Sequence, residues 1–148
     1  MSLREKLKAL EELQQIDLEA NEVNAELDKL PARRARADAA VTAARKAWEE
    51  ARARLEGNER ERRQLESLLG MERDKVKKWE GRLGEIKTPR EYAALSREID
   101  IAKKTNDTQS EQLRELTAQA IEIKTGLDAK EEELSEREAA AQAETEEI

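Results

Sequence analysis

The chain contains no cysteine and no histidine, and these two absences exclude much chemistry. Without these residues there is no disulfide framework, no zinc site of the Cys/His type and no catalysis by a thiol or an imidazole. We therefore expect no metal site and no cofactor. The absence of cysteine is also typical of a cytoplasmic protein, which is the localisation that we predict.

Bulky apolar residues are scarce as well. Aromatic residues make up 2% of the 148 residues, phenylalanine is absent, and charged residues make up 43%. No apolar run approaches the roughly 20 residues that cross a bilayer, so we expect no contact with a membrane. The high content of Ala, Glu, Lys, Leu and Arg indicates a long helix or a coiled coil rather than a globular core.

Two long ladders of seam residues are present, with alternating steps of three and four as in a coiled coil. The first ladder runs from Leu13 to Ile86, and the second runs from Tyr92 to Ile148. When the second is folded back on the first, Ile86 faces Tyr92, and each facing pair of residue numbers sums to 178, twice the number of Pro89. The sequence therefore predicts an all-α fold, a long antiparallel two-helix coiled-coil hairpin.

The predicted turn has its own local signals. Thr88 is suited to cap the second helix, Pro89 to occupy its first position, and Glu91 to complete a capping box. The first helix is expected to end near Ile86 or Lys87. We thus predict one coiled-coil domain over residues 1–148, consisting of an overhanging segment at 1–30, a first arm at 30–86, a tip at 87–89 and a second arm at 90–148.

Pro31 lies inside the first ladder, where it removes a backbone donor and clashes with the preceding turn. We expect a kink or a break over residues 27–31. The pairing places Ile148 opposite Leu30, so residues 1–30 extend past the second helix. They carry an apolar stripe that a second copy of the chain, another partner or further C-terminal sequence would cover. The stripe consists of Leu3, Leu7, Leu10, Leu13, Ile16, Val23 and Leu27.

Charge supports the same pairing. Residues 131–148 carry a net charge of −7 and fold opposite residues 30–47, which carry +4, with Arg34 across from Glu144. Such pairs specify orientation and register more than they stabilise. Polar residues inside the seam, among them Asn58, Arg62 and Asn106, are expected to fix the register as well.

The tip is the best local candidate for a partner contact, because residues 73–104 carry a net charge of +4 in a chain whose total is −7. A basic tip with an aromatic ring suits an acidic protein surface or a single-stranded nucleic acid. Tyr92 and Trp79 occupy seam positions, so packing within the hairpin is an alternative role for both. The candidate contacts are Lys87, Arg90, Tyr92 and Arg97, with Lys77, Lys78 and Arg82 on the approaching helix.

Residues 87–99, which read KTPREYAALSREI, resemble the signature of a bacterial family, as does the pattern of Leu7, Leu10, Leu13, Gln14, Ile16, Asp17 and Glu19. Members of that family join a coiled-coil hairpin to a C-terminal C4-type zinc ribbon. The ribbon is absent here, so we expect either a fragment or a naturally short member. The resemblance implies binding to regulatory or secretion-related proteins, including alternative sigma factors and flagellar components, and to nucleic acid.

We predict a non-enzymatic adaptor or scaffold that binds protein partners. A two-helix rod offers no pocket that would desolvate paired carboxylates, and the sequence has no glycine-rich phosphate loop, so an enzyme is not expected. Two alternatives remain open: binding of RNA or single-stranded nucleic acid through the tip, and a purely structural coiled coil. In the structural alternative the chain assembles as a homodimer through residues 1–30.

Overall fold

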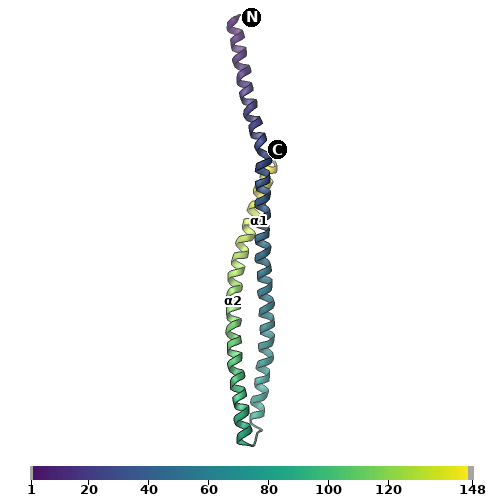
Figure 1. The fold of residues 1–148 in the computed structure, drawn as a ribbon, viewed down its shortest axis with the longest axis vertical. Helices are drawn as coiled ribbons and strands as arrows, with labels where there is room; N and C mark the ends of the chain where they lie inside the picture. Colours follow the sequence, from purple (N-terminus) through teal and green to yellow (C-terminus); the bar gives the residue numbers. More distant parts are fainter. Residues whose placement is uncertain (1, 147–148) are drawn as a thin grey trace. The chain divides into compact units, whose positions relative to one another are not determined.

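The computed structural model describes residues 2–146, which form two helices and no strand. Helix α1 spans Leu3–Leu83 and helix α2 spans Pro89–Glu146 (Figure 1). The two helices pack against each other as an antiparallel hairpin, so the predicted all-α hairpin is confirmed. No helix in the described range has a stretch that is both long and apolar enough to cross a membrane.

The helices are divided between two compact units. Unit 1 is Met1–Ala47 with Glu131–Ile148, of which residues 2–47 and 131–146 are described, and unit 2 is Trp48–Lys130. In unit 2 the two helices join through the turn, and the seam is continuous. In unit 1 the end of α2 packs on α1, while residues 3–29 of α1 are all exposed.

Burial in unit 2 follows the predicted ladders. Every ladder position from Trp48 to Ile86, and from Leu95 to Leu127, is buried or half-buried, whereas most intervening residues are exposed. The most buried apolar side chains are Leu69, Val76 and Ile99, with exposures of 3%, 6% and 4%. The seam thus supplies the apolar burial that holds the two helices together.

Two asparagines lie buried in this seam. Asn58 and Asn106 are 6% and 7% exposed. The Nδ2 atom of Asn58 donates a hydrogen bond of 2.9 Å to the Leu116 carbonyl oxygen on α2, and its Oδ1 atom accepts one of 2.7 Å from Arg62 Nε. A buried amide that is bonded across the seam disfavours shifted pairings, because a shift would leave its polar atoms without partners.

The turn differs from the prediction at one end. Helix α1 ends at Leu83 rather than near Ile86, and the Glu85 amide donates to the Arg82 carbonyl oxygen at 2.9 Å. Gly81 and Gly84 explain the early end, because each weakens a helix by about 1 kcal/mol relative to alanine. Ile86 keeps its half-buried seam position without being helical.

The start of α2 agrees with the prediction for Thr88 and Pro89, but not with the predicted capping box. Pro89 is its first residue, and the Glu91 amide donates to Thr88 Oγ1 at 3.4 Å, so Thr88 is the N-cap. The Tyr92 amide closes the first turn on the Thr88 carbonyl oxygen at 3.0 Å. The reverse bond of a capping box, from the Thr88 amide to the Glu91 carboxylate, is not formed among residues 2–146.

Of the two expectations for Pro31, the structure excludes a break, because α1 continues through this residue. Pro31 and Leu27 are both exposed. At an exposed site, water can satisfy the Leu27 carbonyl oxygen that the proline leaves without a donor. The predicted pairing of Leu30 with Ile148 lies outside the described residues, since Ile148 is not among them.

Charge pairing in unit 1 joins the acidic end of α2 to the arginines of α1. Arg33 Nη2 lies 3.0 Å from Glu144 Oε1, and Arg45 Nη2 lies 3.1 Å from Glu138 Oε1. The complementarity is as predicted, but Glu144 pairs with Arg33 instead of Arg34. Arg34 occupies the seam itself, whereas Arg33 on the flank can reach across to the carboxylate.

Candidate partner-binding site

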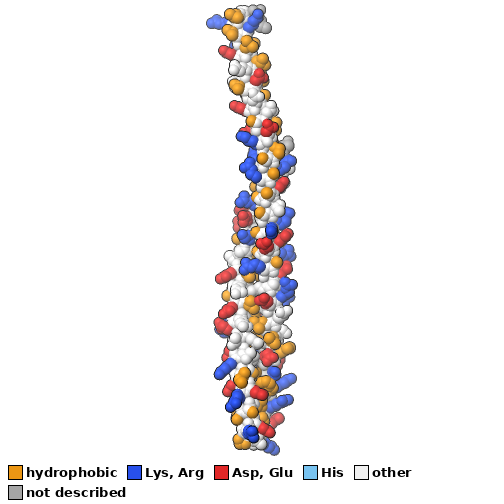
Figure 2. All heavy atoms as spheres, viewed as in Figure 1, with side chains coloured by type: hydrophobic (Ala, Val, Ile, Leu, Met, Phe, Trp, Pro, Cys, Tyr) orange, Lys and Arg blue, Asp and Glu red, His pale blue; other side chains and the backbone are white. Residues whose placement is uncertain are grey.

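The seven residues predicted at the tip all lie in unit 2, and all are exposed to solvent. Figure 2 shows Lys and Arg side chains around the end of the molecule where the turn lies. Tyr92 is 49% exposed, so its ring is only partly covered by the hairpin. The half-exposed Tyr92 ring is available for a contact, in contrast to the half-buried Trp79.

A groove of about 730 Å³ lies beside the turn. Three apolar residues, Ile86, Ala94 and Leu95, belong to its lining and are called its floor here, and its other lining residues are charged and are called its border. The charged residues are Arg82, Glu85, Lys87, Glu91 and Glu98. Among the seven predicted residues, the groove therefore includes Arg82 and Lys87.

The remaining predicted residues are distributed around the turn rather than gathered in one site. Lys77 lines a separate hollow of about 340 Å³ together with Lys103 and Asn106. Lys78, Arg90, Tyr92 and Arg97 are not among the residues that line the groove. The predicted tip residues are thus exposed, but only two of the seven line the groove.

Sequence reasoning missed most of the groove. Four of its residues, Glu91, Ala94, Leu95 and Glu98, follow the spacing i, i+3, i+4 and i+7, which places them on one face of α2. This spacing is a signal in the sequence, but it does not place Ile86, the residue from the turn that completes the groove.

The groove has a mixed charge. Three carboxylates border it against two cations. Phosphates need a surface that is mainly basic, whereas protein surfaces offer charges of both signs together with apolar side chains. The immediate surroundings of the groove therefore suit a protein segment better than a nucleic-acid backbone.

One ion pair in unit 2 raises the pKa of a lysine. Lys103 Nζ lies 2.7 Å from Glu80 Oε1, and both side chains are about half exposed. The hydrogen bond from Lys103 to the Glu80 carboxylate, and the attraction between their charges, raise the pKa of Lys103 above its ordinary value. This pair links α1 to α2 on the outside of the seam.

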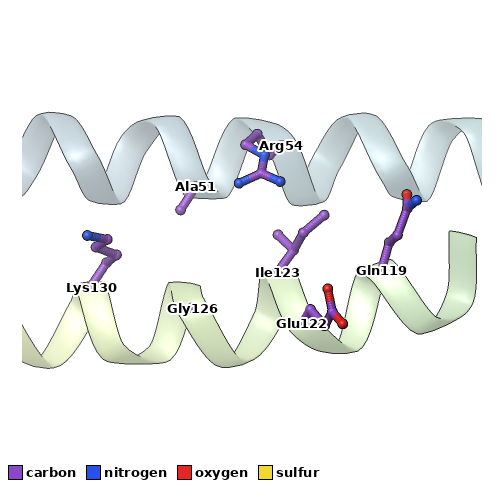
Figure 3. Close-up of a pocket in the computed structure, with 7 residues that line it drawn as sticks. All are labelled: Ala51, Arg54, Gln119, Glu122, Ile123, Gly126 and Lys130. Carbon is purple, nitrogen blue, oxygen red and sulfur yellow. The ribbon is translucent and has the colours of Figure 1, made fainter.

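Figure 3 shows another hollow in unit 2, of about 300 Å³, between α1 and α2. Ile123 points from α2 toward α1, and Ala51 of α1 lies opposite the part of α2 that holds Gly126. Gly126 contributes no side chain, and a Cβ atom placed there would meet no atom within 4 Å. Small residues on both helices account for this gap, so we interpret it as incomplete packing rather than as a site.

The second predicted surface is the apolar stripe in unit 1. Its seven side chains are each more than half exposed, from 53% for Leu27 to 76% for Leu3. Apolar side chains are visible along this N-terminal segment in Figure 2. An apolar face of this length on a single helix is typical of a surface that pairs with another helix.

Among the described residues, no group of three or more Asp or Glu side chains is arranged to hold a metal ion. No protein-family model, curated protein or solved structure matches the chain. The resemblance to the coiled-coil and zinc-ribbon family therefore stays a prediction.

Proposed function

We propose that this chain is a non-enzymatic adaptor or scaffold that binds a protein partner at the groove beside its turn. The observation that carries the proposal is the groove's apolar floor, bordered by charges of both signs. An apolar side chain of a partner would fill the floor, and polar groups around it would meet the charged border.

The borders of the groove suggest the chemistry of this partner. Glu91 and Glu98 are seven residues apart on α2, a separation of about 10.5 Å along the helix. A partner helix with basic residues at the same spacing, and an apolar residue between them, matches that border. Acidic residues on its other side would meet Arg82 and Lys87. This is the helix-in-groove mode of recognition.

Nucleic-acid binding through the tip is the second candidate. It is favoured by the exposed cations and the half-exposed Tyr92 ring, on which a base can stack. It is disfavoured by the three carboxylates of the groove. This candidate predicts an affinity that falls steeply with salt concentration, because bound cations release counterions from the phosphates.

The family resemblance suggests where to look for the partner. On that basis we propose regulatory or secretion-related proteins, including sigma-factor-type and flagellar-type proteins, as the first group to test. A homodimer formed through residues 1–30 is compatible with this adaptor role, because the stripe and the groove have no residue in common.

The experiment compares two substitutions of the same kind on α2. Ala94→Lys puts a long charged side chain on the floor of the groove, and Ala118→Lys makes the same change at an exposed site outside it. Each immobilised protein is incubated with lysate of the source cell, with and without nuclease. We expect the wild type and Ala118→Lys to retain the same proteins, and Ala94→Lys to lose them.

A second variant separates the groove from the surrounding basic surface. Arg90→Glu with Tyr92→Ala removes two exposed residues that do not line the groove, and helicity should be unchanged. Binding of a single-stranded RNA oligonucleotide is measured at two salt concentrations. Salt-sensitive RNA binding that this double variant abolishes, with protein capture unaffected by Ala94→Lys, would overturn the adaptor proposal in favour of nucleic acid.

A further inference from the structure

The apolar stripe of residues 3–20 has an irregular spacing that is symmetric about its own centre. Its positions are Leu3, Leu7, Leu10, Leu13, Ile16 and Ala20, so the steps are 4, 3, 3, 3 and 4. Read in the opposite direction, the steps are the same. An antiparallel second copy therefore presents an identical series of seam positions.

In the symmetric pairing, the two residue numbers of every facing pair have the same sum. Leu3 faces Ala20, Leu7 faces Ile16, and Leu10 faces Leu13, so each facing pair sums to 23. The two-fold axis lies between residues 11 and 12. A contact of this kind is isologous, because the same residues of both copies form it and the assembly closes as a dimer.

The irregular steps also restrict the kind of partner. Three successive steps of three shift the seam around α1 relative to a regular heptad. A partner helix with regular heptads would follow the seam on one side of this shift and lose it on the other. A second antiparallel copy carries the same shift at the same level, so both seams turn together.

Charges flanking the stripe complement each other in this pairing. Arg4 and Lys6 lie on either side of the seam between Leu3 and Leu7, and Asp17 and Glu19 lie on either side between Ile16 and Ala20. The antiparallel alignment places Arg4 and Lys6 of each copy close to Asp17 and Glu19 of the other. The two-fold symmetry repeats this contact at both ends of the pairing. Flanking charges of this kind select the orientation and partner of a coiled coil.

We propose that residues 3–20 form an antiparallel coiled coil with the same residues of a second copy of this chain. The surface is available, because Leu3, Leu7, Leu10, Leu13 and Ile16 are 54–76% exposed and no part of α2 covers them. Glu11 and Glu12, which are adjacent to the axis, lie on the opposite side of α1 from the seam. The pairing leaves Val23 and Leu27 outside it and does not depend on the groove at the turn.

Sedimentation equilibrium of the full chain tests the association. We expect a dimer for the wild type and a monomer for Leu10→Asp, with helicity retained because residue 10 lies outside the packed hairpin. Reversal of the flanking cations, Arg4→Glu with Lys6→Glu, should weaken the dimer about tenfold or more. Adding Asp17→Lys and Glu19→Lys to that same chain should restore it.

The control for total charge is Arg60→Glu with Arg63→Glu, which makes the same change at exposed positions of unit 2 and should leave the dimer unchanged. A wild-type monomer at every concentration tested would overturn the proposal. The proposal would also be overturned if the chain with all four charge substitutions did not recover association, while the Arg60 and Arg63 control behaved like the wild type.

Disulfide mapping tests the alignment, since the chain has no cysteine of its own. A mixture of Leu7→Cys and Ile16→Cys proteins should oxidise mainly to the mixed dimer. Parallel pairing would instead link each variant to itself. Preferential linkage of Leu7→Cys to Val23→Cys would indicate an antiparallel pairing shifted by seven residues, and either result overturns the proposed alignment.

Discussion

Residues 48–83 and residues 3–27 belong to the same helix, and both carry an apolar seam. In the first segment every ladder position is buried or half-buried against α2. In the second segment every residue is exposed. The comparison shows that the spacing of apolar residues determines which face of a helix is apolar, whereas burial depends on whether another helix covers that face.

The largest expected effect comes from truncating one leucine in each segment. Leu69→Ala removes a side chain that is 3% exposed and should lower the free energy of unfolding by about 2–4 kcal/mol. Leu27→Ala, at a site that is 53% exposed, should change it by less than about 0.5 kcal/mol. Urea denaturation followed by circular dichroism measures both values. Equal losses would show that Leu27 is covered in solution, and the comparison would fail.

A smaller effect is expected from the two seam asparagines, which differ in how well they are satisfied. Within residues 2–146, Asn106 Oδ1 is buried with no hydrogen-bond partner. Asn106→Leu should therefore raise the free energy of unfolding by about 1 kcal/mol or more. Asn58→Leu should raise the free energy of unfolding by less, because this substitution also removes the hydrogen bonds to Leu116 and Arg62. If Asn58→Leu raised the free energy of unfolding more than Asn106→Leu did, the result would contradict this difference in hydrogen bonding.

The sequence was sufficient to predict the paired part of the hairpin. Its two ladders, the capping role of Thr88 and the opposite charges of residues 30–47 and 131–148 each have a direct physical reading. These independent signals agree on one alignment. A hairpin is favourable for such reasoning, because its partner helix lies in the same chain and its register follows from the position of the turn.

The errors have local causes that no heptad pattern contains. The end of α1 depends on two glycines near the turn. A proline inside a helix does not have to break it where water can satisfy the carbonyl group that the proline frees, so the heptad pattern does not decide between a kink and a break. The groove was missed for another reason. It requires the non-helical Ile86 to lie against one face of α2, and this arrangement follows from the backbone of the turn.

The smallest effect concerns the outside of the paired region, where Lys103 pairs with Glu80. The carboxylate raises the pKa of Lys103 above 10.5 in the folded state. This stabilising contribution is fully present below the pKa of the unfolded chain and is lost as pH rises through the higher, folded value. Titration of the Lys103 side chain by NMR should show the raised midpoint in the wild type and an ordinary one in Glu80→Gln.

Glu26→Gln provides the matched control, because it removes the same charge from an exposed site on the segment of α1 where every residue is exposed. The midpoint of Lys103 should fall in Glu80→Gln and stay raised in Glu26→Gln. If the two variants responded alike, the shift at Lys103 would reflect the net charge of the protein and not the contact between the helices. A response confined to Glu80→Gln would locate the effect in the paired part of α1, where a side chain of α2 is close enough to act.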